Sequence, residues 1–157
     1  MKLLKSLIKS LVKAVKFLVV EHQTLKVERI LSHSTDVRDD FVPKMLKSIK
    51  ENIAVLGFQI CGDIVIAKQN GFLKFLIPVD KEFESNEHYS FKEQVKLVNA
   101  ARLRHYGSFS KIQSSLAELN DYIIQEKLTP ITVPYIVERD NFDNAYDIYI
   151  GISENVT

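Results

Sequence analysis

Residues 133–139 are predicted to form a β-strand whose single acidic side chain, Glu138, is a candidate for binding a cation. A carboxylate in a partly dry cleft can balance a bound positive charge, because charge pairing strengthens where the dielectric constant is low. An exposed strand carboxylate beside Arg139 is the alternative, and the sequence leaves both open. Glu138 with the hydroxyl of Tyr135 or Tyr149 is also the one pair of side chains that we nominate for catalysis.

Aromatic side chains on predicted strands could form the walls of such a cleft. We single out Tyr135, Tyr149 and Phe75, which can stack on a ligand or hold a cation over the ring, or can belong to the core. Because side chains alternate across a strand, Ile148 and Ile150 share one face, and Asp147 and Tyr149 lie on the other. We therefore expect Tyr149 to face the cleft, away from the helices.

His105 and Gly107 lie where a predicted strand ends and a helix begins at once. The imidazole could bind an anion or shuttle a proton, but we favour a structural role in which it satisfies the backbone of this corner. Gly107 can adopt the positive φ that such a corner often needs. The hydroxyl of Ser108 or Ser110 is available to cap the helix.

Metal-dependent and cofactor-dependent chemistry finds no support in the sequence. The four histidines and the single cysteine show no metal-ligand spacing, and there is no glycine-rich phosphate loop. We therefore expect no metal and no cofactor. Cys61 lies in an apolar run, so we expect a buried free thiol rather than a nucleophile. A lone cysteine is compatible with a reducing cytoplasm.

Residues 1–20 are predicted to form a cationic amphipathic helix, separate from a domain at residues 21–157. Its lysines fall within an arc of about 80° on a helical wheel and its leucines occupy the other side. The lysines are Lys2, Lys5, Lys9, Lys13 and Lys16. The apolar face can pack on this domain or on a second copy, lie in an anionic membrane surface, or dock in a groove of another protein. We favour the first, because an ordered apolar stripe is more often part of a core than a membrane device. A lysine in nearly every turn excludes a membrane span.

The charge of the chain is distributed unevenly. Residues 1–20 carry +5, which leaves −4 for the rest of a chain whose total is +1. A mildly acidic domain offers no electrostatic footprint for nucleic acid, so we expect no direct nucleic-acid binding. We expect the protein to be cytoplasmic, or peripheral to the inner face of the membrane through its helix.

The domain is predicted to consist of two strand–helix–strand–strand repeats that share one spacing of apolar residues. An Asn-Gly turn at residues 70–71 predicts a hairpin in the first repeat. Two such units suggest an α+β fold: an antiparallel sheet with both helices on one face and a cleft between the repeats on the other. The first repeat covers 24–79 (strand 24–31, helix 37–55, strands 58–68 and 72–79). A linker at 80–93 leads to the second repeat, 94–152 (strand 94–106, helix 108–125, strands 131–139 and 145–152).

Three runs of the sequence resemble the gyrase-inhibitor-like small-molecule-binding family, which also supplies the effector domains of AraC-type and MerR-type multidrug regulators of bacteria. They are Leu-Arg-His-Tyr-Gly-Ser-Phe at 103–109, Leu-Ala-Glu-Leu-Asn-Asp-Tyr-Ile at 116–123 and Asp-Ile-Tyr-Ile-Gly-Ile at 147–152. The resemblance covers about residues 24–152 and implies a stand-alone binding module for hydrophobic, often cationic, small molecules. Family members often carry a glutamate and a tyrosine on the penultimate strand, where this chain has only Glu138 as an acid. Tryptophan, common in the family's pockets, is absent.

The leading prediction is a non-catalytic module that holds a hydrophobic or cationic small molecule in the cleft between the repeats. One alternative is a protein-interaction or membrane-surface protein that acts through the N-terminal helix, by self-association or with another partner. A second alternative comes from the resemblance, because some members of this superfamily are hydrolases that use a cleft glutamate with an aromatic hydroxyl; here that pair would be Glu138 with Tyr135 or Tyr149, although we expect no enzyme. In a third, the cleft is filled by the chain's own side chains, for which Phe72, Phe75, Phe83 and Phe91 are large enough.

Overall fold

The computed structural model describes residues 2–139 and 145–153, and the side chains of residues 10–17 lie outside that description. Within these ranges the α-helices are α1 (Lys2–Leu18), α2 (Val42–Asn52) and α3 (Ile112–Gln125). Short 3-10 turns, η1 (Asp39–Phe41) and η2 (Phe109–Lys111), precede α2 and α3. The N-terminal helix forms over the residues that its periodicity predicts. The second helix begins later than residue 37, because Pro43 suits only the first turn of an α-helix.

The strands of the described residues form one sheet. They are β1 (Val20–Thr35), β2 (Val65–Gln69), β3 (Phe72–Pro78), β4 (Ser90–Tyr106), β5 (Thr129–Pro130), β6 (Tyr135–Glu138) and β7 (Ala145–Ser153). The predicted hairpin is confirmed: β2 pairs antiparallel with β3 and places Gln69 opposite Phe72. Gly71 in its turn has a φ of +83°, which glycine adopts without steric cost.

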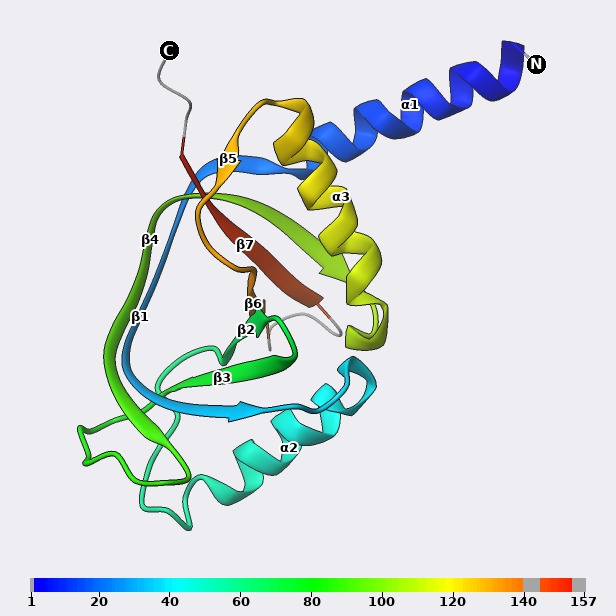
Figure 1. Ribbon diagram of the computed structural model, residues 1–157. Coiled ribbons are helices and arrows are strands. Elements are labelled where there is room, and N and C mark those ends of the chain that lie inside the picture. The colour runs from blue at the N-terminus through cyan, green and yellow to red at the C-terminus, as the bar shows by residue number, and fades with distance from the viewer. Residues whose placement is uncertain (1, 140–144, 154–157) are drawn as a thin grey trace.

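The sheet curls until its long strands meet the other edge. The strand order is β4-β1-β3-β2-β6-β7-β5, and β4 also pairs with β7, so that six strands close into a ring. Each recorded pairing is antiparallel. Figure 1 shows β1 and β4 as an arch on one side of the molecule, with α2 and α3 on the side away from it. The predicted α+β class is confirmed.

Two apolar clusters hold this arrangement together, one on each face of the sheet. The larger cluster lies between the sheet and the helices, and it includes Leu46 of α2, Leu119 of α3 and Phe75 of β3. The smaller one lies inside the ring and joins the arch to the inner strands. Its members are Leu25, Val27, Ile30, Val65, Ala67, Leu76, Val95, Leu97, Ala100, Val137 and Tyr149. The inner face of the sheet is therefore largely closed by the chain's own side chains.

Residues 58–68 do not form one continuous strand, which corrects the prediction for this segment. Only an isolated bridge joins Ile60 to Val79, and β2 begins at Val65. The amide of Cys61 donates to the carbonyl of Pro78 at 2.8 Å, while the amide of Gln59 donates to the Asp80 carboxylate at 2.9 Å. These bonds turn the segment out of the sheet.

Cys61 is consequently exposed, and the expectation of a buried thiol is wrong. The apolar residues around Cys61 belong to a turn rather than to a core strand. The predicted linker at 80–93 is likewise shorter than expected, because β4 begins at Ser90, where it pairs with Ser32 of β1.

Candidate functional site

The corner between β4 and α3 is built around His105, which is buried. Its Nε2 lies 2.9 Å from the carbonyl oxygen of Ser108, and its Nδ1 lies 2.7 Å from Oγ of Ser115. A carbonyl can only accept, so Nε2 donates, and Nδ1 of a neutral ring accepts from the Ser115 hydroxyl. Gly107 has a φ of +112°, and Oγ of Ser108 accepts from the amide of Ser110. The structure thus gives His105 two partners within the fold and places it on the helix side of the sheet.

The structure does not bring Glu138 together with the tyrosines. In the register of β6 and β7, Glu138 lies opposite Tyr146, whereas Tyr135 lies opposite Tyr149. Tyr146 packs in the helix-side cluster. Tyr149 belongs to the cluster inside the ring, and Tyr135 packs against this inner cluster. The Glu138 carboxylate instead pairs with Nζ of Lys50 on α2 at 2.5 Å.

The remaining predicted wall residues also separate. Phe75 is fully buried on the helix side, so it does not line the inner face. Tyr149 does face the interior of the ring, where it is buried. Of the other phenylalanines nominated as plugs, Phe83 and Phe91 belong to an aromatic cluster with Phe58 and Tyr89, and Phe72 is exposed.

The acid inside the ring is Asp147 of β7, a residue that the sequence analysis did not select. Its side chain is completely buried. Nε and Nη2 of Arg104 donate to its two oxygens at 2.7 and 3.0 Å, and Nε of Arg139 donates to Oδ2 at 2.7 Å. Burial raises the pKa of Asp147, but hydrogen bonds from Arg104 and Arg139 outweigh it and hold that pKa below its ordinary value.

Arg139 extends this ion pair to the surface. Its Nη1 donates to Asp63 at 2.6 Å and its Nη2 donates to the hydroxyl of Tyr149 at 3.0 Å. Burial lowers the pKa of Arg139, yet the bonds to Asp147 and Asp63 raise it overall, so the guanidinium stays charged. One signal in the sequence could have revealed the network: aspartate is depleted in strands, and Asp147 interrupts an otherwise apolar strand.

A cavity of about 330 Å³ opens on the inner face of the sheet beside Arg139 and Asp63. Its apolar wall consists of Leu25, Val27, Val65, Pro78, Val79 and Val137. Its polar lining comes from Lys26, Glu28, Arg29, Asp63 and Arg139, and Cys61 and Gly62 complete it. The volume lies within the range of about 300–1,000 Å³ typical of small-molecule sites.

The cavity is lined by charged side chains of both signs, with one more positive than negative. Lys26 pairs with Glu28 at 2.9 Å, and this hydrogen bond lowers the pKa of Glu28. Asp63 pairs with Arg139 at 2.6 Å. Arg29 is exposed and belongs to neither pair. The lining therefore has three cationic side chains against two anionic ones.

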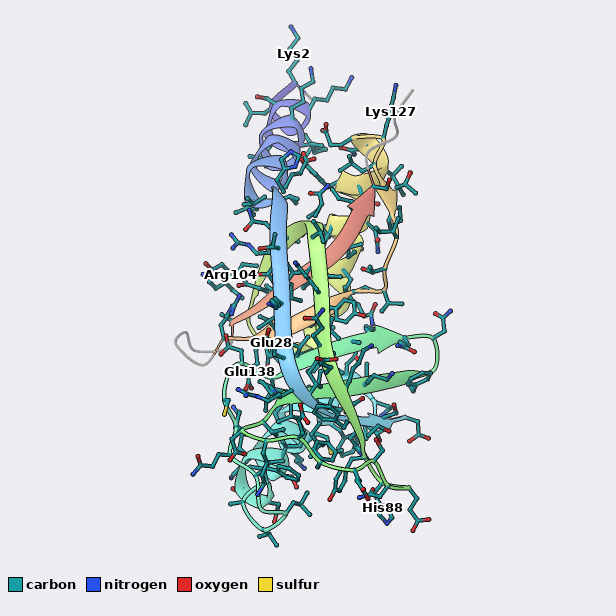
Figure 2. The ribbon with its side chains drawn as sticks, turned by 90° about the vertical axis from the view of Figure 1, so that its left-hand side faces the viewer. Lys2, Glu28, His88, Arg104, Lys127 and Glu138 are labelled. Carbon is teal, nitrogen blue, oxygen red and sulfur yellow. The ribbon has the colours of Figure 1, made fainter. Side chains whose placement is uncertain are left out.

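Arg29 also has an unusual backbone, with a φ of +50° within β1. Side chains without glycine's freedom rarely adopt this conformation, which costs about 1–3 kcal/mol and gathers at binding sites. Its carbonyl accepts from the amide of Val79 at 2.8 Å, which fixes the bend. The bend interrupts the alternation of β1, so that Val27 and Ile30, which are three residues apart, are buried on the same face of the sheet. Figure 2 shows the neighbouring Glu28 about midway along the molecule.

Two classes of function find no scaffold in the described ranges. Among these residues no group of three or more histidine, cysteine, aspartate or glutamate side chains could hold a metal ion. No helix there combines the length and the apolar character that crossing a bilayer requires. Of the helix lysines, Lys2, Lys5 and Lys9 are exposed, whereas the side chains of Lys13 and Lys16 lie outside the described residues.

Comparison with known proteins identifies the fold. No protein-family model and no curated protein matches this sequence. The C-terminal domain of EcmrR is similar with a TM-score of 0.64 and 11% identity, over 87% of this chain and 99% of that domain. EcmrR in a complex with DNA matches at the same TM-score and identity, over 96% of this chain and 69% of that one. A hydrolase from Listeria innocua matches with a TM-score of 0.50 and 12% identity, over 90% and 97% of the two chains.

Proposed function

We propose that this protein is a non-catalytic binding module that holds a small molecule with both apolar and polar parts in the cavity between β1, β2 and β6. The observation that carries the proposal is the cavity itself: an apolar wall on one side and the Arg139–Asp63 pair at its polar end. Small-molecule sites combine apolar surface with a few fixed polar groups, and here polar atoms make up more than half of the exposed lining, which suits a ligand with both apolar and polar parts. The resemblance to gyrase-inhibitor-like domains and the fold shared with the C-terminal domain of EcmrR are consistent with such a module.

The ligand site is displaced from the centre of the ring. The centre is occupied by the inner cluster, which includes Leu97, Tyr149 and Val137. The cavity lies where β1 bends at Arg29 and the segment around Gly62 leaves the sheet. A ligand there would lie on Val27, Val65 and Val137 and present its polar group toward Arg139.

The charges of the lining favour a neutral or anionic ligand over a cation. The nearest buried acid, Asp147, is already neutralised by Arg104 and Arg139, so it has little attraction left for a bound cation. Arg29 adds a positive charge at the rim. A lipophilic cation would therefore approach a net positive lining.

The shared fold does not decide between binding and hydrolysis, because one fold supports unrelated functions. The nominated hydrolytic pair does not meet: Glu138 lies on the helix side with Lys50, and Tyr135 and Tyr149 lie with the inner cluster. Asp147 is held between two arginines and is not poised to move a proton near neutral pH. These contacts favour binding over catalysis.

A matched pair of probes tests both the site and its charge preference. Tetraphenylborate and tetraphenylphosphonium have nearly the same shape and opposite charge. Cys61 is the only cysteine of the chain, it is exposed, and it lines the cavity. Its rate of alkylation, followed by mass spectrometry, therefore reports occupancy. We expect tetraphenylborate to protect Cys61 in a saturable manner and at lower concentration than tetraphenylphosphonium.

The substitution Arg29→Asn removes the surplus charge while keeping a side chain that tolerates a positive φ. It should reduce the preference for the anion, whereas Arg38→Asn, a change of equal charge on the exposed residue that precedes η1, should not. If neither probe protects Cys61 at any concentration that leaves the fold intact, the proposed site is refuted.

A further inference from the structure

Helix α1 exposes a row of apolar side chains that the domain does not cover. Leu3 is 88% exposed, and Leu4, Leu7 and Ile8 are each more than half exposed. Figure 1 shows α1 extending away from the body of the molecule, with the N-terminus at its far end. An apolar row of this kind on a helix normally packs against another surface.

The C-terminal end of α1 is attached to the domain, whereas its N-terminal half is exposed. Val19, directly after the helix, is buried in the helix-side cluster. Two residues further on, Oε2 of Glu21 accepts a hydrogen bond of 2.6 Å from the hydroxyl of Tyr122 on α3. The helix is therefore attached to the body at one end and presented to the surroundings at the other.

Charge indicates what the exposed row meets. Lys2, Lys5 and Lys9 are exposed on the same half of α1 as the leucines, and the first 20 residues contain five lysines and no acid. Figure 2 shows Lys2 at one extreme of the molecule and His88 at the other. A helix with lysines on one side, leucines on the other and modest overall hydrophobicity is the type that lies in a lipid interface.

We propose that α1 lies in the surface of an anionic lipid bilayer, with its leucines at the acyl boundary and its lysines at the headgroups. The remainder of the chain carries −4, so an anionic surface repels the body while it attracts the helix. The domain and its cavity are then held beside the membrane by α1. This inference concerns a different surface from the ligand cavity and does not depend on it.

The same charges make a symmetric helix pair a poorer occupant. Two copies of α1 that pack through their leucine faces would carry ten lysines on their outer sides, and neither helix has an acid to balance them. A bilayer containing anionic lipid supplies the missing countercharge over the whole length of the helix. Pairing of copies and docking to another protein are the outcomes that would displace the proposal.

The test uses the full chain and vesicles of phosphatidylcholine with about one-third phosphatidylglycerol. We expect sedimentation with these vesicles, little or none with phosphatidylcholine alone, and release when salt rises from about 0.1 M to about 1 M, because the Debye length shrinks from about 10 Å to 3 Å. The pair Lys5→Gln and Lys9→Gln should lower partitioning by about fivefold per lysine. The pair Leu4→Gln and Leu7→Gln should abolish it.

The matched control carries Lys96→Gln and Lys111→Gln, which change the net charge equally at exposed positions outside α1. It should partition as the unchanged protein does. Light scattering on each form gives the oligomeric state. Equal partitioning of the leucine variant, equal loss in the control, or no binding to anionic vesicles would each overturn the proposal. So would a dimer that the leucine substitutions dissociate while the unchanged protein ignores vesicles.

Discussion

Replacing Asp147 by asparagine removes the charge at the centre of the buried network without changing its size. The carboxylate accepts three hydrogen bonds, two from Arg104 and one from Arg139. An asparagine keeps only one acceptor oxygen. Its amide NH₂ replaces the other oxygen and cannot accept a hydrogen bond from a guanidinium N–H. One or two charge-assisted bonds are lost, at about 1.5–3 kcal/mol each.

A second route to the magnitude gives a similar answer. Asp147 is fully buried, and the side chains of Arg104 and Arg139 are only 28% and 26% exposed. Removing one partner of a buried ion pair costs about 3–5 kcal/mol, because the remaining charge stays desolvated. We therefore expect Asp147→Asn to lower the free energy of unfolding by about 3–5 kcal/mol, a large share of the about 5–15 kcal/mol of a typical domain.

Urea denaturation at neutral pH measures this loss. With an m-value of about 2 kcal/mol/M, the midpoint should fall by about 2 M. Asp121→Asn is the control, because Asp121 is exposed on α3 and undergoes the same chemical change. A midpoint shift below about 0.5 M for Asp147→Asn would refute the view that this network stabilises the fold.

The pH dependence gives an independent check. The pKa of Asp147 is lower in the folded state than in the unfolded chain, so its contribution is present above the unfolded value of about 3.9. That contribution is lost as the pH falls through the folded value. The stability gap between the unchanged protein and Asp147→Asn should therefore narrow in acid. A gap that stays constant from neutral pH down into acid would assign the loss to packing rather than charge.

Three further predictions concern the elements that position the site. Burial and the hydrogen bond to Glu21 raise the pKa of Tyr122 to about 12, above its ordinary 10.0. Stability should therefore fall as the pH rises from about 10 to about 12, and Tyr122→Phe should remove this part of the loss in alkaline melting experiments; an unchanged alkaline profile would contradict it. Leu119→Ala should lower the free energy of unfolding by about 2–5 kcal/mol, because Leu119 is fully buried on α3. The control is Ile124→Ala on the same helix, where the side chain is 72% exposed, and it should change the free energy of unfolding by less than about 0.5 kcal/mol. Similar urea midpoints for Leu119→Ala and Ile124→Ala would show that α3 is packed differently. Gly107→Ala should cost about 1–3 kcal/mol through its φ of +112° alone, since an added Cβ meets nothing within 4 Å. An unaltered thermal midpoint for Gly107→Ala would show that the corner relaxes freely.

Local sequence signals predicted most of the elements. The three helices follow the spacing of their apolar residues, as in the buried set Ile112, Leu116, Leu119 and Ile123 of α3. The Asn-Gly turn located the β2–β3 hairpin, and the glycine at residue 107 marked the corner after β4. These features depend on residues close in the chain, so short windows of sequence carry the information. The division into two repeats stays a prediction.

The candidate site was predicted less well, because it depends on strand register. Alternation along β6 already places Tyr135 and Glu138 on opposite faces, but only the packing of the sheet shows that Tyr135 faces the inner cluster and that Glu138 faces Lys50 of α2. The exposed position of Cys61 follows from bonds to Pro78 and Asp80, outside its own segment. No window around residue 61 contains that information.

The sequence by itself determined the α+β class, the cationic, leucine-rich pattern of α1, and the order of helices and strands except for the short β5, which it did not predict. Tertiary structure alone decided that β4 would close the sheet onto β7, that Arg29 would bend β1, and that Asp147 would meet Arg104 and Arg139. The physical reason is that periodicity fixes which side chains share a face of one element. Which faces then meet depends on pairing between strands as far apart as residues 104 and 147, and that pairing exists only in the folded chain.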